Sequence, residues 1–197
     1  VYFPFFSAVS NQNRRLIQNT LLLEDDDVAS PRYKMNLSEL TACASVATML
    51  MLCSPHNPVG RVWRKDELNS VLDIANKHDL IVLADEIHAD LVYTNAQHHM
   101  LGRLACDSAK SMAAFEENCR VITAVSPSKT FNIPGLGLSA LIVPNKAHRQ
   151  AIESHLNKLG VSVTNPFNMA AFETAYREGG DWLNALMLYL QTTRDEA

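Results

Sequence analysis

The chain has 197 residues, of which 47% are hydrophobic and 19% are charged, and its formal net charge is −4. Its length and apolar content are sufficient for one large hydrophobic core. The acidic balance provides no basic face for nucleic acid, and no apolar run is long enough to cross a bilayer. We therefore expect a globular domain with no nucleic-acid or membrane partner.

The four cysteines are widely spaced, and no pair has the Cys-x-x-Cys spacing that is typical of zinc or redox sites. Reduced thiols and a cytoplasmic location fit this pattern best. The chain starts at Val1 rather than at a methionine, and it stops within a charged helical pattern at residues 194–197. We interpret residues 1–197 as one domain that is incomplete at both ends. The cysteines are Cys43, Cys53, Cys106 and Cys119.

The first part of the chain predicts one strand and one helix. The strand is expected over residues 15–23, and the acidic stretch at 24–27 follows it. This stretch lacks the ligand spacing and the glycine of a calcium-binding loop, so we interpret it as a solvated turn. The helix is expected over residues 36–43, with Asn36 or Ser38 as its N-cap.

The next part alternates strands with a helix. A continuous apolar run over 46–53 predicts a strand buried on both faces, and it ends in the dense turn residues of 54–60. Helical periodicity follows over 65–78, and a second apolar strand over 80–84 ends at Asp85. This order is typical of strands that lie parallel in one sheet.

After a loop through Gly102, the pattern predicts a helix over 108–119, a strand over 121–125 and a further strand over 138–143. The rest is expected to be helical over residues 145–159, 166–177 and 181–193. The glycine pair at 179–180 is the most hinge-like point, so a smaller second domain is expected after about residue 180. The alternation as a whole predicts an α/β fold with a mostly parallel sheet and helices on both faces.

Three predicted strands end in polar side chains. Asn57 follows the first strand, Asp85 ends the second, and Lys129 lies just after the third. The carboxyl ends of parallel strands meet at one edge of a sheet, so we expect these groups to converge there. A lysine just past a buried strand is expected to be partly desolvated, which favours its nucleophilic form. An amine, a carboxylate and an amide are the groups that pyridoxal phosphate requires.

Three motifs carry a resemblance to a known family. The segments SPHNPVG at 54–60, ADEIHADL at 84–91 and SPSKTFNIPGL at 126–136 resemble signatures of fold-type I pyridoxal 5′-phosphate enzymes of the class I/II aminotransferase superfamily. The branch they most resemble is the MalY/PatB-type cystathionine β-lyases. The resemblance implies the large, cofactor-binding domain of such an enzyme. It also implies a homodimer and a small amino-acid substrate.

The resemblance assigns the central roles to the three strand-end residues. Lys129 would hold the cofactor aldehyde as a Schiff base and later move the substrate α-proton. Asp85 would pair with the pyridine nitrogen, and Asn57 would bond to the phenolic oxygen of the ring.

It also assigns four supporting roles. His88 stands where many aminotransferases carry a tyrosine, and it would be a second donor to the phenolic oxygen. This histidine favours the lyase branch. Ser126 and Ser128 would meet the cofactor phosphate, and Tyr2 would stack on the ring.

Other interpretations of single residues stay open. Asp85 and His88 could form a metal pair, but a third ligand is missing, because we interpret the adjacent His98 and His99 as solvated loop residues. We therefore predict no metal site. Glu86 could be the structural partner of a buried group, and Tyr2 could equally be an ordinary core residue.

The leading functional hypothesis is a carbon–sulfur β-lyase that acts on cystathionine or cysteine conjugates and releases pyruvate, ammonia and a thiol. An aminotransferase would use the same groups. A third hypothesis, motivated by the missing ends, is an inactive or regulatory fragment that retains the fold. Members of the family also have an upstream Gly-rich segment that binds the phosphate and a downstream arginine that binds the substrate, and we find neither segment in residues 1–197. Gly137 also stands where many aminotransferases have a phosphate-binding arginine.

Overall fold

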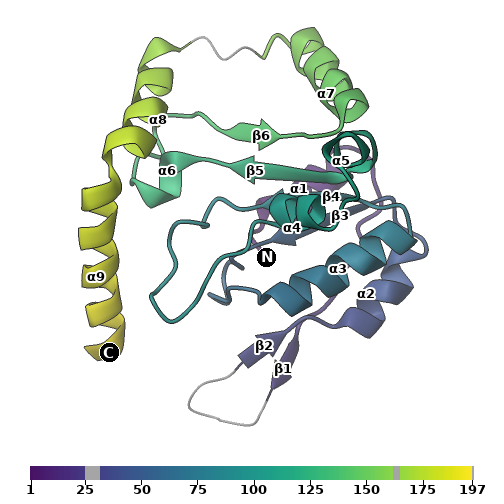
Figure 1. Ribbon diagram of the computed structural model, residues 1–197, viewed down its shortest axis with the longest axis horizontal. Coiled ribbons are helices and arrows are strands. Elements are labelled where there is room, and N and C mark those ends of the chain that lie inside the picture. Colours follow the sequence, from purple (N-terminus) through teal and green to yellow (C-terminus); the bar gives the residue numbers. More distant parts are fainter. Residues whose placement is uncertain (25–31, 162–164, 197) are drawn as a thin grey trace.

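A four-stranded sheet lies at the centre of the chain (Figure 1). Its strands are β3 (Met49–Cys53), β4 (Ile81–Asp85), β5 (Val121–Val125) and β6 (Ala140–Ile142), in that order. β3, β4 and β5 are parallel, and β6 runs antiparallel to β5. The prediction of a mostly parallel α/β sheet is therefore confirmed. The computed structural model describes residues 1–24, 32–161 and 165–196.

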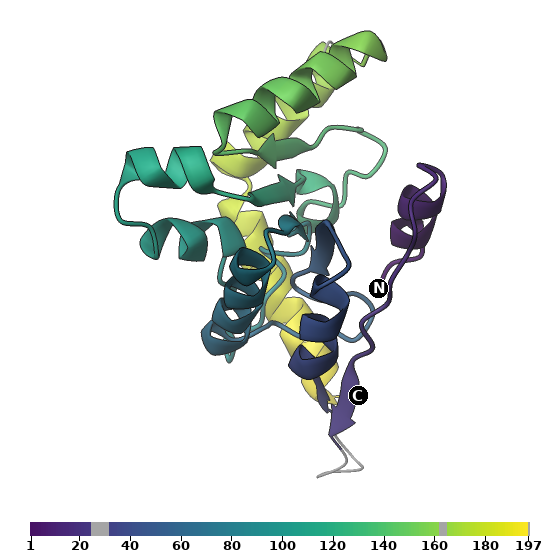
Figure 2. The same ribbon diagram turned by 90° about the vertical axis from the view of Figure 1, so that its right-hand side faces the viewer.

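One side of the sheet carries α3 (Lys65–Lys77), α4 (Leu101–Asp107) and α5 (Met112–Asn118), as Figure 2 shows. α2 (Leu37–Ala44) packs against α3. The buried apolar side chains of α2, α3 and α4 recur every three or four residues, so each of these helices packs one stripe into the core, whereas α5 buries none of its residues. Leu68 of α3 is fully buried in the resulting core.

The two faces of β4 differ in burial. Side chains alternate between the faces of a strand. Val82 and Ala84 point toward the covering helices and are 1% and 0% exposed. Ile81, Leu83 and Asp85 lie on the opposite face and are only half-buried. On that side lies α1, residues 4–10, which buries none of its own residues (Figure 2).

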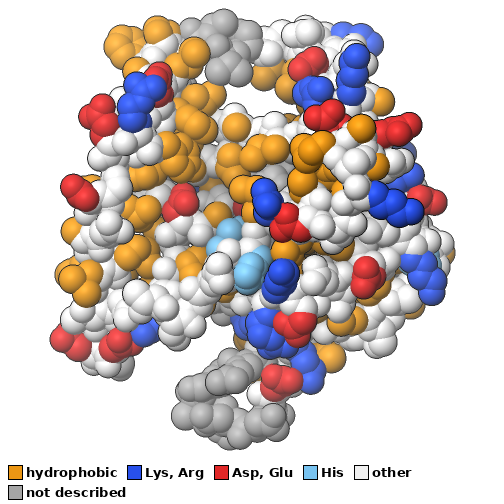
Figure 3. Space-filling model, in the orientation of Figure 1, with side chains coloured by type: hydrophobic (Ala, Val, Ile, Leu, Met, Phe, Trp, Pro, Cys, Tyr) orange, Lys and Arg blue, Asp and Glu red, His pale blue; other side chains and the backbone are white. Residues whose placement is uncertain are grey.

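Among the helices of the C-terminal part, the short one after β5 and the last two lie around the edge where the parallel strands end, whereas the helix after β6 lies at the opposite edge (Figure 1). The short helix α6 (Pro127–Thr130) directly follows β5, and α7 (Lys146–Lys158), α8 (Pro166–Glu178) and α9 (Gly180–Glu196) come after β6. None of the described residues of α7, α8 and α9 is fully buried. Figure 3 shows hydrophobic side chains gathered over α8 and α9, so these helices expose apolar surface.

Most of the sequence-based elements are confirmed within a few residues. Asn36 caps α2, because its side-chain oxygen accepts the amide of Glu39. The strand expected to be buried on both faces begins only at Met49, which is 49% exposed because β3 is an outer strand of the sheet. All four cysteines are free thiols. Among the helices that the structure describes, none combines the length and apolar character of a transmembrane span.

Two element predictions are wrong. The strand expected over 15–23 is reduced to β1 (Leu22–Glu24), since only these residues find a partner, β2 (Arg32–Lys34). The helix expected over 108–119 begins at Met112, and the loop expected through Gly102 contains α4 instead. Apart from Glu24, the acidic turn expected at 24–27 lies outside the described residues.

Candidate active site

The three parallel strands end at one level. Cys53 pairs with Asp85, and Asp85 pairs with Ala124, so the last residues of β3, β4 and β5 are aligned across the sheet. Asn57 follows β3 by four residues, and Lys129 follows β5 within α6. The register therefore brings the segments that carry all three predicted groups to the same edge.

Hydrogen bonds from two buried residues, Trp63 and Cys53, fix the turn after β3. Trp63 donates its indole N–H to the carbonyl oxygen of Cys53 at 2.9 Å. The Cys53 sulfur accepts the backbone amide of Asn57 at 3.3 Å. Burial raises the pKa of the Cys53 thiol, so it remains protonated near neutral pH. The backbone of Asn57 is thus fixed by a buried neutral thiol.

Asp85 is the half-buried carboxylate at the end of β4. Burial raises the pKa of its carboxyl group, whereas the amide of Ile87, which donates to Oδ1 at 3.2 Å, and the nearby His88 act in the opposite direction. A carboxylate in such a setting is better stabilised by an added cationic partner than an exposed one. Asp85 is therefore suited to hold a protonated ring nitrogen.

His88 is within electrostatic reach of both charged groups of the predicted site. Burial lowers its pKa, the carboxylate of Asp85 opposes this change, and the positive charge of Lys129 adds to it. Both charges therefore lie within electrostatic reach of the imidazole. His88 is neutral near pH 7, which leaves it one N–H to donate and one nitrogen to accept.

Lys129 belongs to α6, whose start is fixed by Ser126. The Ser126 hydroxyl accepts the amide of Ser128 at 3.2 Å and donates to the carbonyl of Leu138 at 2.9 Å. The Lys129 side chain itself is exposed, and its ammonium has no hydrogen-bond or ion-pair partner among the described residues. The predicted desolvation of this lysine is therefore wrong: α6 leaves the strand end and presents the side chain to solvent.

Thr130 ties the lysine segment to the segment after β4. It is 0% exposed, and its hydroxyl donates to Oδ2 of Asp90 at 3.0 Å. A buried hydroxyl with a charged acceptor makes a stronger bond than a neutral pair. The backbone on either side of Lys129 is thus anchored.

Tyr2 is 54% exposed, so the alternative that it is a core residue is wrong. It nevertheless lies near the β3 turn. The amino group of Val1 is close enough to contribute to the lowered pKa of His56, whose main cause is burial. The role of Tyr2 in stacking stays a prediction.

The sequence missed one contact. His98 was expected to be solvated, but its Nε2 lies 2.8 Å from Oε2 of Glu86, and its side chain is only 12% exposed. The interpretation of Glu86 as a structural partner of a buried group is confirmed. A signal existed: Glu86 directly follows Asp85, so alternation turns it toward the covered face. Within the described parts of the chain, no three metal-ligating side chains cluster.

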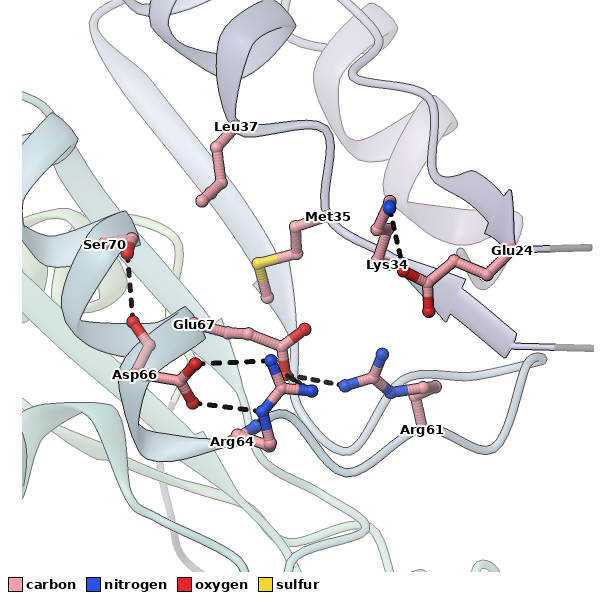
Figure 4. Close-up of a pocket in the computed structure, with 9 residues that line it drawn as sticks. All are labelled: Glu24, Lys34, Met35, Leu37, Arg61, Arg64, Asp66, Glu67 and Ser70. Carbon is pink, nitrogen blue, oxygen red and sulfur yellow. Dashed lines mark hydrogen bonds and ion pairs between the residues drawn. The ribbon is translucent and has the colours of Figure 1, made fainter. Parts of the chain in front are cut away.

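A polar cavity of about 240 Å³ lies elsewhere, at the base of the β1–β2 hairpin (Figure 4). Its cations are engaged with neighbouring acids. Lys34 contacts Glu24 at 2.7 Å, and Arg61 contacts Glu67 at 2.6 Å. Figure 4 also shows Arg64 paired with an aspartate of α3. The cavity contains none of the predicted site residues, and Arg61, which also donates to the carbonyl oxygen of Tyr33 in β2, joins the hairpin to α3.

Comparison with known proteins identifies the family. The model of the family described as aminotransferase class I and II matches residues 27–196. The chain belongs to this family. The resemblance seen in the sequence motifs is thereby confirmed.

Three relatives show which members of the family the chain is similar to. Cystathionine beta-lyase PatB from Bacillus subtilis (strain 168) is 34% identical over the whole chain, which spans 48% of that protein. The crystal structure of cystalysin from Treponema denticola contains a pyridoxal 5′-phosphate cofactor. It is 35% identical, with a TM-score of 0.83 over 95% of this chain and 44% of that one. The PLP-bound C-S lyase from Staphylococcus hominis is 26% identical, with a TM-score of 0.82 over 96% of this chain and 44% of that one. The chain thus spans about half the length of the relatives it matches.

Proposed function

We propose that the protein is a pyridoxal 5′-phosphate-dependent carbon–sulfur β-lyase that converts cystathionine or cysteine conjugates to pyruvate, ammonia and a thiol. One observation carries the proposal. Three aligned strand ends bring an amide, a carboxylate and an amine to one edge, and the last two both act electrostatically on His88. The names of the relatives favour the lyase over other reactions of the family.

The donor set fits the cofactor. Asp85 is a half-buried carboxylate that has no cationic partner in hydrogen-bond contact among the described residues, as a group that pairs with a ring nitrogen requires. The amino group of Lys129 has no partner among the described residues, and in its deprotonated form it would condense with an aldehyde and release water. When bound, pyridoxal phosphate supplies an electron sink for the charge that develops at the substrate α-carbon.

Lys129 would serve twice in the reaction. Its amine would first hold the cofactor aldehyde. Once the amine of the substrate has displaced it, the free lysine would take the proton from the α-carbon as a general base. Asp85 would keep the ring nitrogen protonated throughout, because a negative charge at hydrogen-bond distance favours the cationic form. These two residues account for proton removal and charge storage before the thiolate leaves.

The remaining residues would orient the ring. Asn57, with its backbone fixed by Cys53, and the neutral His88 would donate to the phenolic oxygen. Ser126 and Ser128 would meet the phosphate. The Ser126 hydroxyl lies 2.9 Å from the carbonyl oxygen of Leu138 and 3.0 Å from the Ser128 hydroxyl, so the two serines are already linked to each other. Tyr2 would stack on the ring from the exposed N-terminal segment.

The assembly of the whole protein is part of the proposal. A second domain would begin after about residue 180, and the protein would be a cytoplasmic homodimer with sites at the subunit interface. Exposed apolar side chains support a further covered surface. Phe3 is 81% exposed, and Leu188 and Tyr189 of α9 are 70% and 68% exposed.

The test uses the full-length product of the reading frame that encodes this chain. The protein is mixed with cystathionine, and pyruvate is followed along with the visible absorption of the bound cofactor. We expect pyruvate from the wild type. Lys129→Ala should lower the rate by at least about 100-fold, the smaller end of the effect of a general base. Lys146→Ala, which changes an exposed lysine at the start of α7, is the matched control and should behave as wild type.

Other results point to the alternatives. An absence of pyruvate, combined with keto-acid formation when an acceptor is added, would identify an aminotransferase. A protein that stays colourless after reconstitution would favour the inactive or regulatory hypothesis. A monomer with full activity in light scattering would contradict the proposed dimer.

A further inference from the structure

We propose that Glu86 and His98 form a positioning pair that closes the base of the loop after β4 and thereby holds Asp85 and His88 in place for the cofactor. This inference rests on the proposed function. Neither residue is expected to touch the cofactor. They would act through the segment that carries the two groups that do.

The carboxylate of Glu86 uses both oxygens to join the two ends of this loop. Oε2 lies 2.8 Å from Nε2 of His98, twelve residues further along the chain. Oε1 accepts the amide of Leu101, fifteen residues further along, at 2.9 Å. The Glu86 side chain is 0% exposed. Burying a carboxylate is strongly unfavourable unless it is paired and hydrogen-bonded, so opening the loop would expose or unpair this charge.

Leu101 is the first residue of α4, and this position further stabilises its hydrogen bond with Glu86. The first amides of a helix have no partner within the helix, and its N-terminus favours negative charge. Met100, the N-cap of α4, makes no side-chain capping bond. Glu86, the residue that follows β4, therefore supplies the cap that the local sequence lacks.

The pair is connected to the candidate site through the backbone. Glu86 donates its amide to Ala124 of β5 at 2.9 Å, and its carbonyl accepts the amide of Ala89 at 2.9 Å. The turn that this second bond closes contains His88. Since Glu86 is fixed at both its backbone and its side chain, Asp85 before it and His88 after it have little freedom to shift.

The middle of the loop is held separately, by α9. Thr94 donates its amide and its hydroxyl to Oε1 of Gln191, at 3.3 and 3.1 Å. The guanidinium of Arg194 lies over the ring of Tyr93 at 4.2 Å. These contacts are exposed, so they are weaker than the buried pair at the base. The loop thus has one strong anchor near the site and one weak anchor away from it.

Electrostatics gives the pair a second effect on Asp85. The negative charge of Glu86 adds to the burial that raises the pKa of Asp85. A donor on His98 disperses this charge. Without that donor, Asp85 would be less fully ionised and would hold a ring cation less firmly.

The test compares variants of His98 in the full-length protein loaded with pyridoxal phosphate. The dissociation constant of the cofactor is measured from its visible absorption, and kcat and KM are measured with cystathionine. For His98→Ala we expect the cofactor to bind about tenfold more weakly, the equivalent of one lost buried hydrogen bond. We expect kcat to fall by up to about 100-fold from misplacement of the site, and KM to change less.

Three further variants sharpen this test. His99→Ala is the matched control, because His99 is the next residue in the loop and no hydrogen bond joins it to any described residue. It should behave as wild type. His98→Gln places an amide donor close to the position of Nε2, whereas the shorter side chain of His98→Asn cannot reach Glu86. We expect Gln to restore cofactor affinity and kcat, and Asn to resemble Ala.

Each outcome supports or overturns the inference. If His98→Ala and His99→Ala bind the cofactor equally and have equal kcat, the inference is overturned even when the His98→Ala protein is less stable to urea. If the alanine variant does not fold, equal affinities of the Gln and Asn variants overturn it. A wild type that binds no cofactor overturns the proposed function, and this inference with it. Cofactor binding by the wild type with no effect at His98 removes only the inference.

Discussion

The two faces of the central sheet differ in what they contribute. On the covered face, Val82 and Ala84 pack beneath helices and are excluded from solvent. On the opposite face, Leu83 and Asp85 are only half-buried. Burial of apolar surface is the dominant stabilising effect, so the first face supplies most of the stability. The second is only partly covered, so a group that binds there would not require the core to open.

The difference between the two faces is clearest at two consecutive acidic residues, Asp85 and Glu86. Asp85 ends β4 on the half-open face and lies within electrostatic reach of His88. Glu86 turns to the covered face, where His98 and α4 engage both of its oxygens. Two carboxylates of similar chemistry thus have different surroundings because of the side of the backbone on which they lie.

The largest effect is expected on the half-open face. Asp85→Asn keeps the shape of the side chain and removes its charge, so kcat/KM for pyruvate release should fall by about 100- to 1000-fold. The free energy of unfolding in urea should change by less than about 1 kcal/mol. Asp73→Asn, on the exposed side of α3, is the control and should leave both quantities unchanged. Full activity of Asp85→Asn would contradict the assignment of the chemistry to the half-open face.

On the covered face, we expect the opposite pattern. Leu68→Ala removes a side chain that is 0% exposed and should lower the free energy of unfolding by about 2–5 kcal/mol. The remaining folded protein should still show the visible band of bound cofactor. Leu188→Ala, in a residue that is 70% exposed on α9, should change stability by less than about 0.5 kcal/mol. Equal effects at the two leucines would mean that the core lies elsewhere.

Acid should weaken the covered side through His56, which packs edge-to-face on Trp63 and is 8% exposed. Burial lowers the pKa of His56 to about 4. Between about pH 6.5 and 4, His56 binds a proton in the unfolded chain but not in the folded chain. The contribution of neutral His56 to the free energy of unfolding is therefore complete above about pH 6.5 and is lost as the pH falls. The loss should approach roughly 3 kcal/mol. Urea unfolding at several pH values between neutrality and the folded-state pKa should show a slope that His56→Gln reduces.

The smallest effect is expected where the sheet edge meets the C-terminal helices. A Cβ at Gly179 would lie 2.4 Å from the ring of Phe131, which follows α6, and 2.4 Å from the carbonyl oxygen of Ala175, whereas one at Gly180 would meet no atom within 4 Å. Gly179→Ala should therefore lower the free energy of unfolding by about 1–3 kcal/mol, and Gly180→Ala should not destabilise the protein. Thermal unfolding of the pair checks this. Equal melting temperatures would show that α8 and α9 are not held by Phe131.

The sequence predicts those features that depend on neighbouring residues. The five residues of β5 are predicted with the correct bounds, because a short apolar run ends sharply at a polar turn. The strand ends at Asp85 and before Asn57 follow from the same pattern, and parallel pairing is enough to align them. Those parts of the fold and the placement of the site segments are accessible without coordinates.

Features that depend on distant contacts are not accessible in this way. α4 contains a glycine and has no local cap, and its first amide is satisfied by Glu86, which lies fifteen residues earlier at the end of β4. His98 is indistinguishable in the sequence from its neighbour, since its partner lies twelve residues away. The exposure of Lys129 depends on the direction in which α6 leaves the sheet. Periodicity contains no information on that direction.

The attachment of Lys129 has a consequence of its own. Ser128 is tied to Ser126 on one side, and Thr130 is tied to Asp90 on the other, while the long side chain between them is unrestrained by any described residue. Lys129 therefore combines a mobile side chain with a fixed backbone. By changing only its side-chain rotamer, Lys129 could bring its amine to two neighbouring positions in succession without any movement of the main chain. The role proposed for Lys129, which would first bind an aldehyde and later accept a proton, requires that combination.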